Sequence, residues 1–272
     1  MKYCYLLGLA LLGFACNTTD STTEEAETTA VVTDSTAVKF NAEGSDRTAM
    51  EWARAVMKAQ GGKAAWDSAR YFHWNFFGRR TLLWDKKTDR VRIEKLEDST
   101  VYLINLREDE GRVFTNGSEM QNPAHLPDLI QEGKSIWNND SYWLFMPFKL
   151  MDPGVTLYYA GMMSDEADST KKAAVLELHF DKVGDTPQNK YRVYVDPRDS
   201  LIHAWAYYNK REDENPTIIT PWKDYKEYNG LMLSSDRGEG RMISDIWVKQ
   251  EVSDKYFTEF WPSKEQKQNT NP

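Results

Sequence analysis

An unbroken apolar run, Tyr142 to Met146, is the feature that most constrains the fold of this chain. Proline removes a backbone donor and clashes with the preceding turn, so Pro147 predicts that a helix through the run ends near Met146. Asn139 or Asp140 can cap the start of that helix, because a side-chain oxygen accepts an unpaired backbone N–H. A helix that is apolar on every side has no face for water. The run therefore predicts a short buried helix in the hollow of a curved sheet.

Most of the remaining chain alternates between apolar and polar residues, which is typical of strands. The first such stretch begins at Tyr71, where Phe72, Trp74 and Phe76 share one face. Asn229 and Gly230 give the strongest hairpin signal, because both tolerate positive φ. Further strands are expected at Thr81–Trp84, Arg90–Leu96, Val101–Leu106, Arg112–Thr115, Thr156–Ala160, Ala173–Phe180, Tyr191–Val195, Leu201–Asn209, Thr217–Tyr228, Leu231–Asp236, Met242–Val252 and Tyr256–Phe260.

Helical patterns are few and do not alternate with the strands. Apolar residues between Met50 and Met57 fall at helical spacing, and Gly61 is expected to end that helix. Shorter helices are expected over Lys63–Ala69 and Asp128–Trp137. Runs of strands interrupted by one helical insert indicate an α+β fold that is mostly antiparallel β, with a single sheet and the helices on one side of it.

Length and charge narrow the functional classes. The 272 residues carry a net charge of −8 and are 40% hydrophobic, which suits one sizeable domain, expected from Asp46 to Trp261. No basic stripe is present to neutralise phosphates, so nucleic acid is excluded as a partner. The acidic balance also disfavours binding to anionic lipid head groups. We expect a monomer without a cofactor.

The N-terminal segment has the pattern of a secretory signal. Lys2 precedes an apolar core, Leu6 to Ala15, that is about ten residues long and much shorter than the ~20 residues needed to span a bilayer. Cys4 and Cys16 are the only cysteines. Removal of residues 1–15 would leave one thiol, so an internal disulfide is impossible in the mature chain.

The residues up to the second cysteine, Leu12-Gly13-Phe14-Ala15-Cys16, resemble a bacterial lipobox. This resemblance implies that Cys16 becomes the lipid-modified first residue. An ordinary signal-peptidase site remains the alternative, because Gly13 and Ala15 also suit that enzyme. Residues 16–45 are polar and acidic, and we expect them to form a disordered tether behind the lipid anchor. A disordered tail is expected at 262–272.

Catalytic and metal-binding patterns are weak. The four histidines, His73, His125, His179 and His203, form no i, i+4 pair of the zinc type. The sequence lacks a G-x-S-x-G elbow and a phosphate-binding glycine loop with its lysine. Asp196 and Asp199 could form a carboxylate pair, but acids at such a turn are ordinarily solvated. We therefore expect no catalytic residue, no metal and no enzymatic activity.

Large apolar side chains are the remaining signal. Those of the first strands would share a sheet face that meets the apolar insert, and they could line a groove for a ligand or form an ordinary packed core. The candidate ligand-binding residues are Phe72, Trp74, Phe76, Trp84, Trp143, Phe145, Met146, Phe148 and Met151.

Four short motifs stand out along the chain: Gly61-Gly62-Lys63-x-x-Trp66, Pro147-Phe148-Lys149-Leu150-x-Asp152-Pro153-Gly154, Tyr194-Val195-Asp196-Pro197 and Trp222-x-x-Tyr225-x-x-Tyr228-Asn229-Gly230-Leu231. Together they resemble the LolA/LolB-like lipoprotein-carrier superfamily, and more closely bacterial envelope lipoproteins of that type. The resemblance implies an open, half-closed β-barrel, a strongly curved sheet with helices on the concave side, whose apolar concave face holds a lipid or acyl chain.

Two functions follow as expectations. The first is a lipoprotein anchored in the cell envelope, at the outer membrane and facing the periplasm or the surface, that binds a lipid or other hydrophobic ligand. The second is an envelope interaction or scaffold protein whose barrel is filled by its own side chains. A cavity of several hundred Å³ would favour the first.

Overall fold

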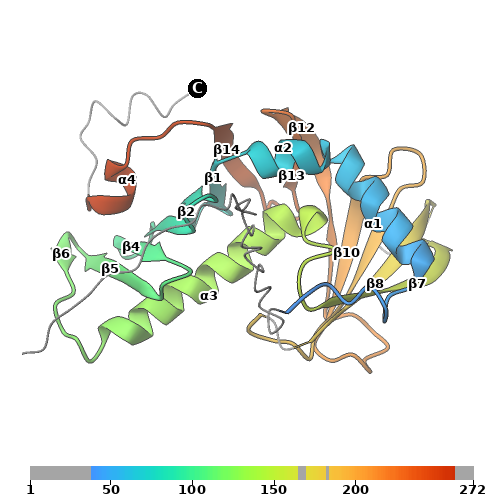
Figure 1. Ribbon diagram of the computed structural model, residues 1–272, viewed down its shortest axis with the longest axis horizontal. Coiled ribbons are helices and arrows are strands. Elements are labelled where there is room, and N and C mark those ends of the chain that lie inside the picture. Colours follow the sequence, from blue (N-terminus) through green and yellow to red (C-terminus); the bar gives the residue numbers. More distant parts are fainter. Residues whose placement is uncertain (1–37, 165–169, 182–183, 261–272) are drawn as a thin grey trace, which may run out of the picture. The chain divides into compact units, whose positions relative to one another are not determined.

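The computed structural model describes residues 38–164, 170–181 and 184–260. The expected signal peptide, Cys16, residues 17–37 of the expected tether and the tail lie outside these residues. Within them the fold is mixed α+β and mostly antiparallel, as the sequence predicts, and it contains several sheets and one long helix (Figure 1).

The first sheet has seven strands in the order β14-β1-β2-β3-β4-β5-β6. Its first five strands in the sequence are joined by tight turns, and each pairs with the one before it, so most of the sheet is a local meander. The strands are β1 Tyr71–Phe76, β2 Arg80–Asp85, β3 Arg90–Lys95, β4 Thr100–Asn105, β5 Glu110–Thr115, β6 Ser118–Glu119 and β14 Ile243–Lys249.

The second sheet has five strands in the order β11-β10-β9-β8-β7. A separate two-stranded hairpin, β12-β13, turns at Asn229 and Gly230, whose φ angles of 53° and 81° confirm the predicted turn. The strands are β7 Val155–Ser164, β8 Lys172–Phe180, β9 Lys190–Val195, β10 Ile202–Tyr208, β11 Ile218–Pro221, β12 Lys223–Tyr228 and β13 Leu231–Asp236.

Four α-helices and one 3₁₀ turn are described: α1 Arg47–Ala59, α2 Gly62–Ser68, α3 Leu126–Phe145, η1 Met146–Phe148 and α4 Lys255–Thr258. α3 ends at Phe145, two residues before Pro147, as the sequence predicts. The expectation of a separate helix capped by Asn139 or Asp140 is wrong, because α3 runs through both residues without interruption. The Asp140 carboxylate instead accepts two hydrogen bonds from Arg80 on β2, at 2.7 and 2.9 Å.

Two hydrophobic cores result. Core 1 lies against the seven-stranded sheet and includes Trp74, Phe145 and Leu231. Core 2 lies against the five-stranded sheet, where α1 contacts β7 and β8 through small residues such as Ala49 and Ala53. α3 runs along the seven-stranded sheet, and its C-terminal end reaches core 2, where Trp143 packs against both cores (Figure 1).

The expectation of one strongly curved half-barrel is not met. The described strands form three sheets, and none of them closes on itself. The expected strand over Thr217–Tyr228 is broken at Trp222, where the chain leaves the five-stranded sheet for the hairpin. The segment expected as the last strand, Tyr256–Phe260, instead contains the short helix α4.

The end of the expected tether is also ordered. The backbone of Asn41 donates to Val155 at 3.0 Å, and that of Asp46 donates to Leu157 at 2.8 Å, so residues 39–46 follow the first half of β7. The Ser45 hydroxyl accepts a hydrogen bond from the Leu157 backbone at 3.0 Å. Among the described helices, none combines the length and the apolar character that crossing a bilayer requires.

Candidate functional site

Most of the residues predicted to line a groove form packed core instead. Phe72, Trp74, Phe76, Trp84, Phe145 and Phe148 belong to core 1, and Met146 is fully buried in core 2. Trp66 of α2 fills the remaining space, because its ring stacks on Phe148 with centroids 4.4 Å apart. These seven side chains are packed in the two cores, as the alternative of an ordinary core also allowed. Their role in binding a ligand stays a prediction.

A cavity of about 590 Å³ lies elsewhere, between the C-terminal end of α3 and the five-stranded sheet. Of the nine predicted residues only Trp143 lines it, and Met151 packs in core 2 without reaching it. Seven of the residues that line the cavity are aromatic. Three come from α3 (Trp137, Tyr142 and Trp143), and four come from the sheet (Phe180, Tyr191, Trp205 and Tyr207).

Strand periodicity gathers the sheet rings on one face. Trp205 and Tyr207 are two residues apart on β10, and Tyr207 is the register partner of Tyr191 on β9. Because side chains alternate between the faces of a strand, all three point to the same side. The Tyr191 ring lies 5.2 Å from both Trp205 and Tyr207, and 5.4 Å from Tyr142 of α3. The rings thus support one another as a continuous wall.

Burial keeps the deep tyrosines of this wall neutral. The Tyr142 hydroxyl is buried without a hydrogen-bond partner among the described residues, and burial raises its pKa well above the usual value. Burial likewise raises the pKa of Tyr191. A neutral phenol is the easier form to hold beside apolar surface. The deep wall therefore presents rings without charge.

Polar side chains also line the cavity. The Lys149 ammonium lies 2.5 Å from the Asp152 carboxylate, so this pair neutralises itself. Asn189 donates from Nδ2 to the Tyr207 hydroxyl at 3.0 Å and fixes the edge of that ring. Lys149 and Asp152 belong to a motif that the sequence singled out, and its alternate members Phe148 and Leu150 are buried in the cores.

A buried arginine holds the α3 side of the cavity. The Arg237 guanidinium is fully buried after β13, and it donates from Nη2 to the Trp143 carbonyl at 2.6 Å and from Nη1 to Ser234 Oγ at 2.8 Å. Its Cζ lies 3.8 Å from the centroid of the Trp222 ring. Burial lowers the pKa of Arg237 to about 9. The last carbonyls of a helix have no partner within the helix, so Arg237 caps the end of α3 and fixes Trp143.

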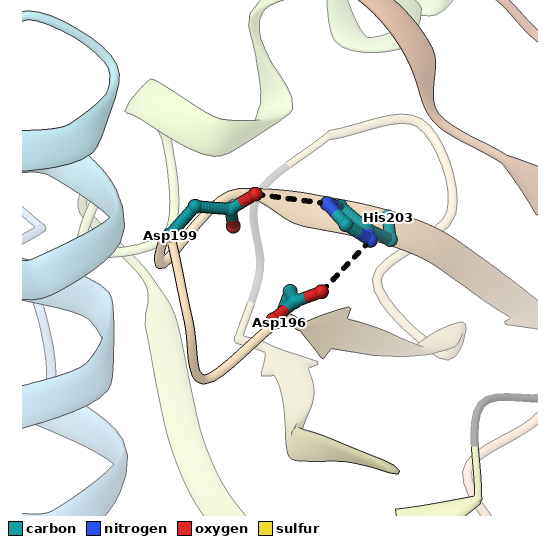
Figure 2. A group of neighbouring side chains, drawn as sticks. All are labelled: Asp196, Asp199 and His203. Atoms are coloured by element: carbon teal, nitrogen blue, oxygen red, sulfur yellow. Dashed lines mark ion pairs between the residues drawn. The ribbon is translucent and has the colours of Figure 1, made fainter. Parts of the chain in front are cut away.

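The carboxylate pair noted in the sequence is a different feature. Asp196, Asp199 and His203 meet at the turn from β9 to β10, where each ring nitrogen of His203 lies 3.4 Å from one carboxylate (Figure 2). Arg198 donates to both Asp196 oxygens, and mainly these bonds lower the pKa of Asp196 to about 2. A glycosidase acid needs a raised pKa, which Asp196 lacks. A metal ion would have to displace Arg198 from Asp196. We therefore interpret the three side chains as a cluster that stabilises the turn between β9 and β10.

The fold and the cavity together define an α+β protein with a cavity between its long helix and one of its antiparallel sheets. The chain belongs to DUF6503, a family of unknown function, whose model matches residues 121–256. Those residues include every described position that lines the cavity. No curated protein matches the sequence.

Two solved structures are similar to the chain. One is a DUF1329 family protein from Desulfovibrio piger, with a TM-score of 0.42, 12% identity, and coverage of 77% of this chain and 96% of that one. The other is MucB, with a TM-score of 0.23, 12% identity, and coverage of 71% and 68%. The similarity at these TM-scores is too weak to carry a functional argument.

The sequence reasoning missed most of the cavity. Tyr191, Trp205 and Tyr207 lie on strands that were predicted correctly, and the spacing of Trp205 and Tyr207 already placed two rings on one face. That signal could have been found. The role of Arg237 had no such signal, because a single arginine beside a glycine in a loop is ordinarily solvated.

Proposed function

We propose that this protein binds a lipid or other hydrophobic ligand in the cavity between α3 and the five-stranded sheet. The observation that carries the proposal is the cavity itself. Its volume of about 590 Å³ falls in the range of small-molecule sites, and its lining combines aromatic rings with polar and charged side chains. No catalytic constellation accompanies the cavity among the described residues, so binding without chemistry is the activity we propose.

Affinity in the micromolar range is expected. Burying a ten-carbon chain contributes about 8 kcal/mol, at ~0.8 kcal/mol per methylene, before the costs of association are subtracted. The polar side chains add orientation more than affinity, because Lys149 and Asp152 already satisfy each other. A ligand of this kind would survive gentle purification in part, and native mass spectrometry would report its mass.

A matched pair of variants tests the site. Tyr207 lines the cavity, whereas Tyr158 lies on β7 outside it and is 38% exposed. We expect Tyr207→Glu to weaken binding of the fluorescent probe N-phenyl-1-naphthylamine at least tenfold, because it places a charge on the cavity wall. Tyr158→Glu should leave the affinity unchanged. Thermal melts of both variants would show that each is folded, and equal probe affinities in all three proteins would reject the site.

We also propose that the protein works in the cell envelope, anchored at the outer membrane through a lipid on Cys16. The support comes from the sequence: a short apolar run, a lipobox-like motif, and an acidic stretch behind it. Detergent phase partitioning of the full chain and of Cys16→Ser would test the anchor. Recovery of both proteins in the aqueous phase would contradict it.

A second candidate function is interaction with another protein of the envelope. One observation favours it: β7 is an edge strand of the five-stranded sheet, and Met162 and Met163 near its end are 49% and 37% exposed. Exposed apolar residues on an unpaired edge are typical of surfaces that recruit a partner. If the probe fails to bind, this function becomes the preferred one.

A further inference from the structure

The cavity wall has an unusual composition for a lipid site. Seven aromatic residues line it, against three aliphatic ones, Pro153, Val155 and Ile218. Neither leucine nor methionine is found among its described lining residues. Flexible side chains of those two types adapt to bent acyl chains, whereas aromatic rings turn about only two bonds and keep flat faces. The wall is therefore suited to a flat, rigid shape.

The rings are also fixed in place before any ligand arrives. Tyr191 is in ring contact with Tyr142, Trp205 and Tyr207. Trp143 meets Trp205 edge to face, with centroids 4.8 Å apart, and its backbone is held by Arg237. Such a wall loses little side-chain freedom on binding, and a rigid ligand loses little of its own. A flexible chain would lose many rotamers on entering the same space.

The cavity lining also offers neutral hydrogen-bonding groups beside the charged Lys149, Asp152 and Asp185. These groups are the side chains of Asn138, Asn139, Thr186 and Asn189 and the Tyr207 hydroxyl. Amides and hydroxyls both donate and accept, so they recognise a hydroxyl or carbonyl group without requiring charge. A ligand that combines a flat body with one polar edge would match both parts of the cavity.

We propose that the ligand is a planar, ring-bearing molecule with a hydroxyl or carbonyl edge, which stacks against the Tyr207, Tyr191 and Trp143 side of the cavity. This inference rests on the proposed function, because it names the ligand class of the same site. The inference predicts an order of affinities for a flat and a linear alcohol that is the reverse of the order expected from hydrophobicity alone. A linear alcohol transfers more apolar surface from water than a flat aromatic alcohol of equal carbon number.

The test uses 2-naphthol and 1-decanol, which each have ten carbons and one hydroxyl. Isothermal titration calorimetry on the full chain should show 2-naphthol binding at least tenfold more tightly than 1-decanol. Equal or tighter binding of 1-decanol would overturn the ring-bearing class and leave the proposed function standing. Absence of binding by both alcohols and by N-phenyl-1-naphthylamine, up to about 100 μM, would overturn the proposed function as well.

A single substitution sharpens the result. Tyr207→Leu replaces a ring by an aliphatic side chain, so it should weaken 2-naphthol at least fivefold while 1-decanol is unchanged or binds more tightly. Tyr158→Leu, outside the cavity, should alter neither affinity. A variant that merely perturbs the fold would weaken both ligands together. A parallel loss of both affinities in a Tyr207→Leu protein of normal melting temperature would also reject stacking.

Discussion

The two main sheets bear similar aromatic side chains and use them differently. Against the seven-stranded sheet, α2, α3 and η1 supply large rings, and Trp66 packs against both Phe145 and Phe148. Against the five-stranded sheet, α1 supplies alanines and a valine, and its contacts fall on β7 and β8. The rings on β9 and β10 instead line the cavity together with the rings at the end of α3. Whether aromatic residues form a packed core or a cavity wall thus depends on how completely the neighbouring elements cover them.

The largest effect is expected in the filled core. Trp74 is fully buried and meets Phe145 edge to face at 5.3 Å. Trp74→Ala should lower the free energy of unfolding by about 3–5 kcal/mol, because it removes a large apolar side chain and leaves a void. Denaturant melts measure this loss. A cost below about 1 kcal/mol would show that this core tolerates voids as the other one does, and the contrast between the sheets would disappear.

An intermediate effect is expected at the junction of the two regions. Arg237→Met should cost about 2–3 kcal/mol, because hydrogen bonds from a charged donor to the Trp143 carbonyl and Ser234 are lost, while relief from burying the charge offsets part of that loss. The probe affinity should fall with the stability, since Trp143 is no longer held. Arg237→Lys keeps the charge but lacks the planar guanidinium, so its stability should lie between those of the wild type and Arg237→Met. An Arg237→Met protein of full stability and affinity would show that packing alone holds α3.

The smallest effect is expected on the far face of the five-stranded sheet. Burial acts to raise the pKa of Glu177, but hydrogen bonds from His179 and Arg192 outweigh it and lower this pKa to about 2. Because the folded pKa lies below the ordinary one, this stabilisation is complete above about pH 4.5 and is lost as the pH falls toward 2. The loss should be about 1–2 kcal/mol, which is less than the full pKa difference implies, because Glu177 is only partly buried and solvent screens its charge.

Urea melts between pH 6 and pH 2 would test this, with Glu177→Gln as the control that lacks the titrating group. The wild type should lose more stability than the variant over that interval. If stability falls equally with pH in both proteins, the hydrogen bonds of Glu177 with His179 and Arg192 contribute no pH-dependent stability. An unchanged probe affinity in the variant would confirm that this face acts independently of the cavity.

The fold class and most elements could be predicted because period-two alternation and turn residues act locally. Asn229 and Gly230, and the break at Pro147, are decided within a few residues. The continuity of α3 was missed because Asn139 and Asp140 look like caps, whereas tertiary pairing with Arg80 holds Asp140 inside the helix. The break at Trp222 was missed because burying that ring beside Arg237 depends on another element.

The cavity could not be predicted from the same patterns. Alternation tells which residues of a strand share a face, and it places Trp74 and Trp205 on a strand face equally well. It does not tell which helix covers that face, nor how large its side chains are. Phe145 is buried in core 1, whereas Trp143, two residues earlier on the same helix, lines the cavity. That distinction depends on the packing of elements far apart in the chain.

The pairing of β1 with β14 has a consequence for how the chain folds. Tyr71 of β1 pairs with Lys249 of β14, so one edge of β1 stays unpaired until β14 has been synthesised. The meander from β1 to β5 consists of neighbouring hairpins and can form early, whereas this closure is a contact of very high sequence separation and is slow. Until it forms, β1 presents a row of unpaired backbone groups. We therefore expect the pairing of β14 with β1 to be a late step of folding. Loss of β14 would leave the edge of β1 exposed and prone to aggregation.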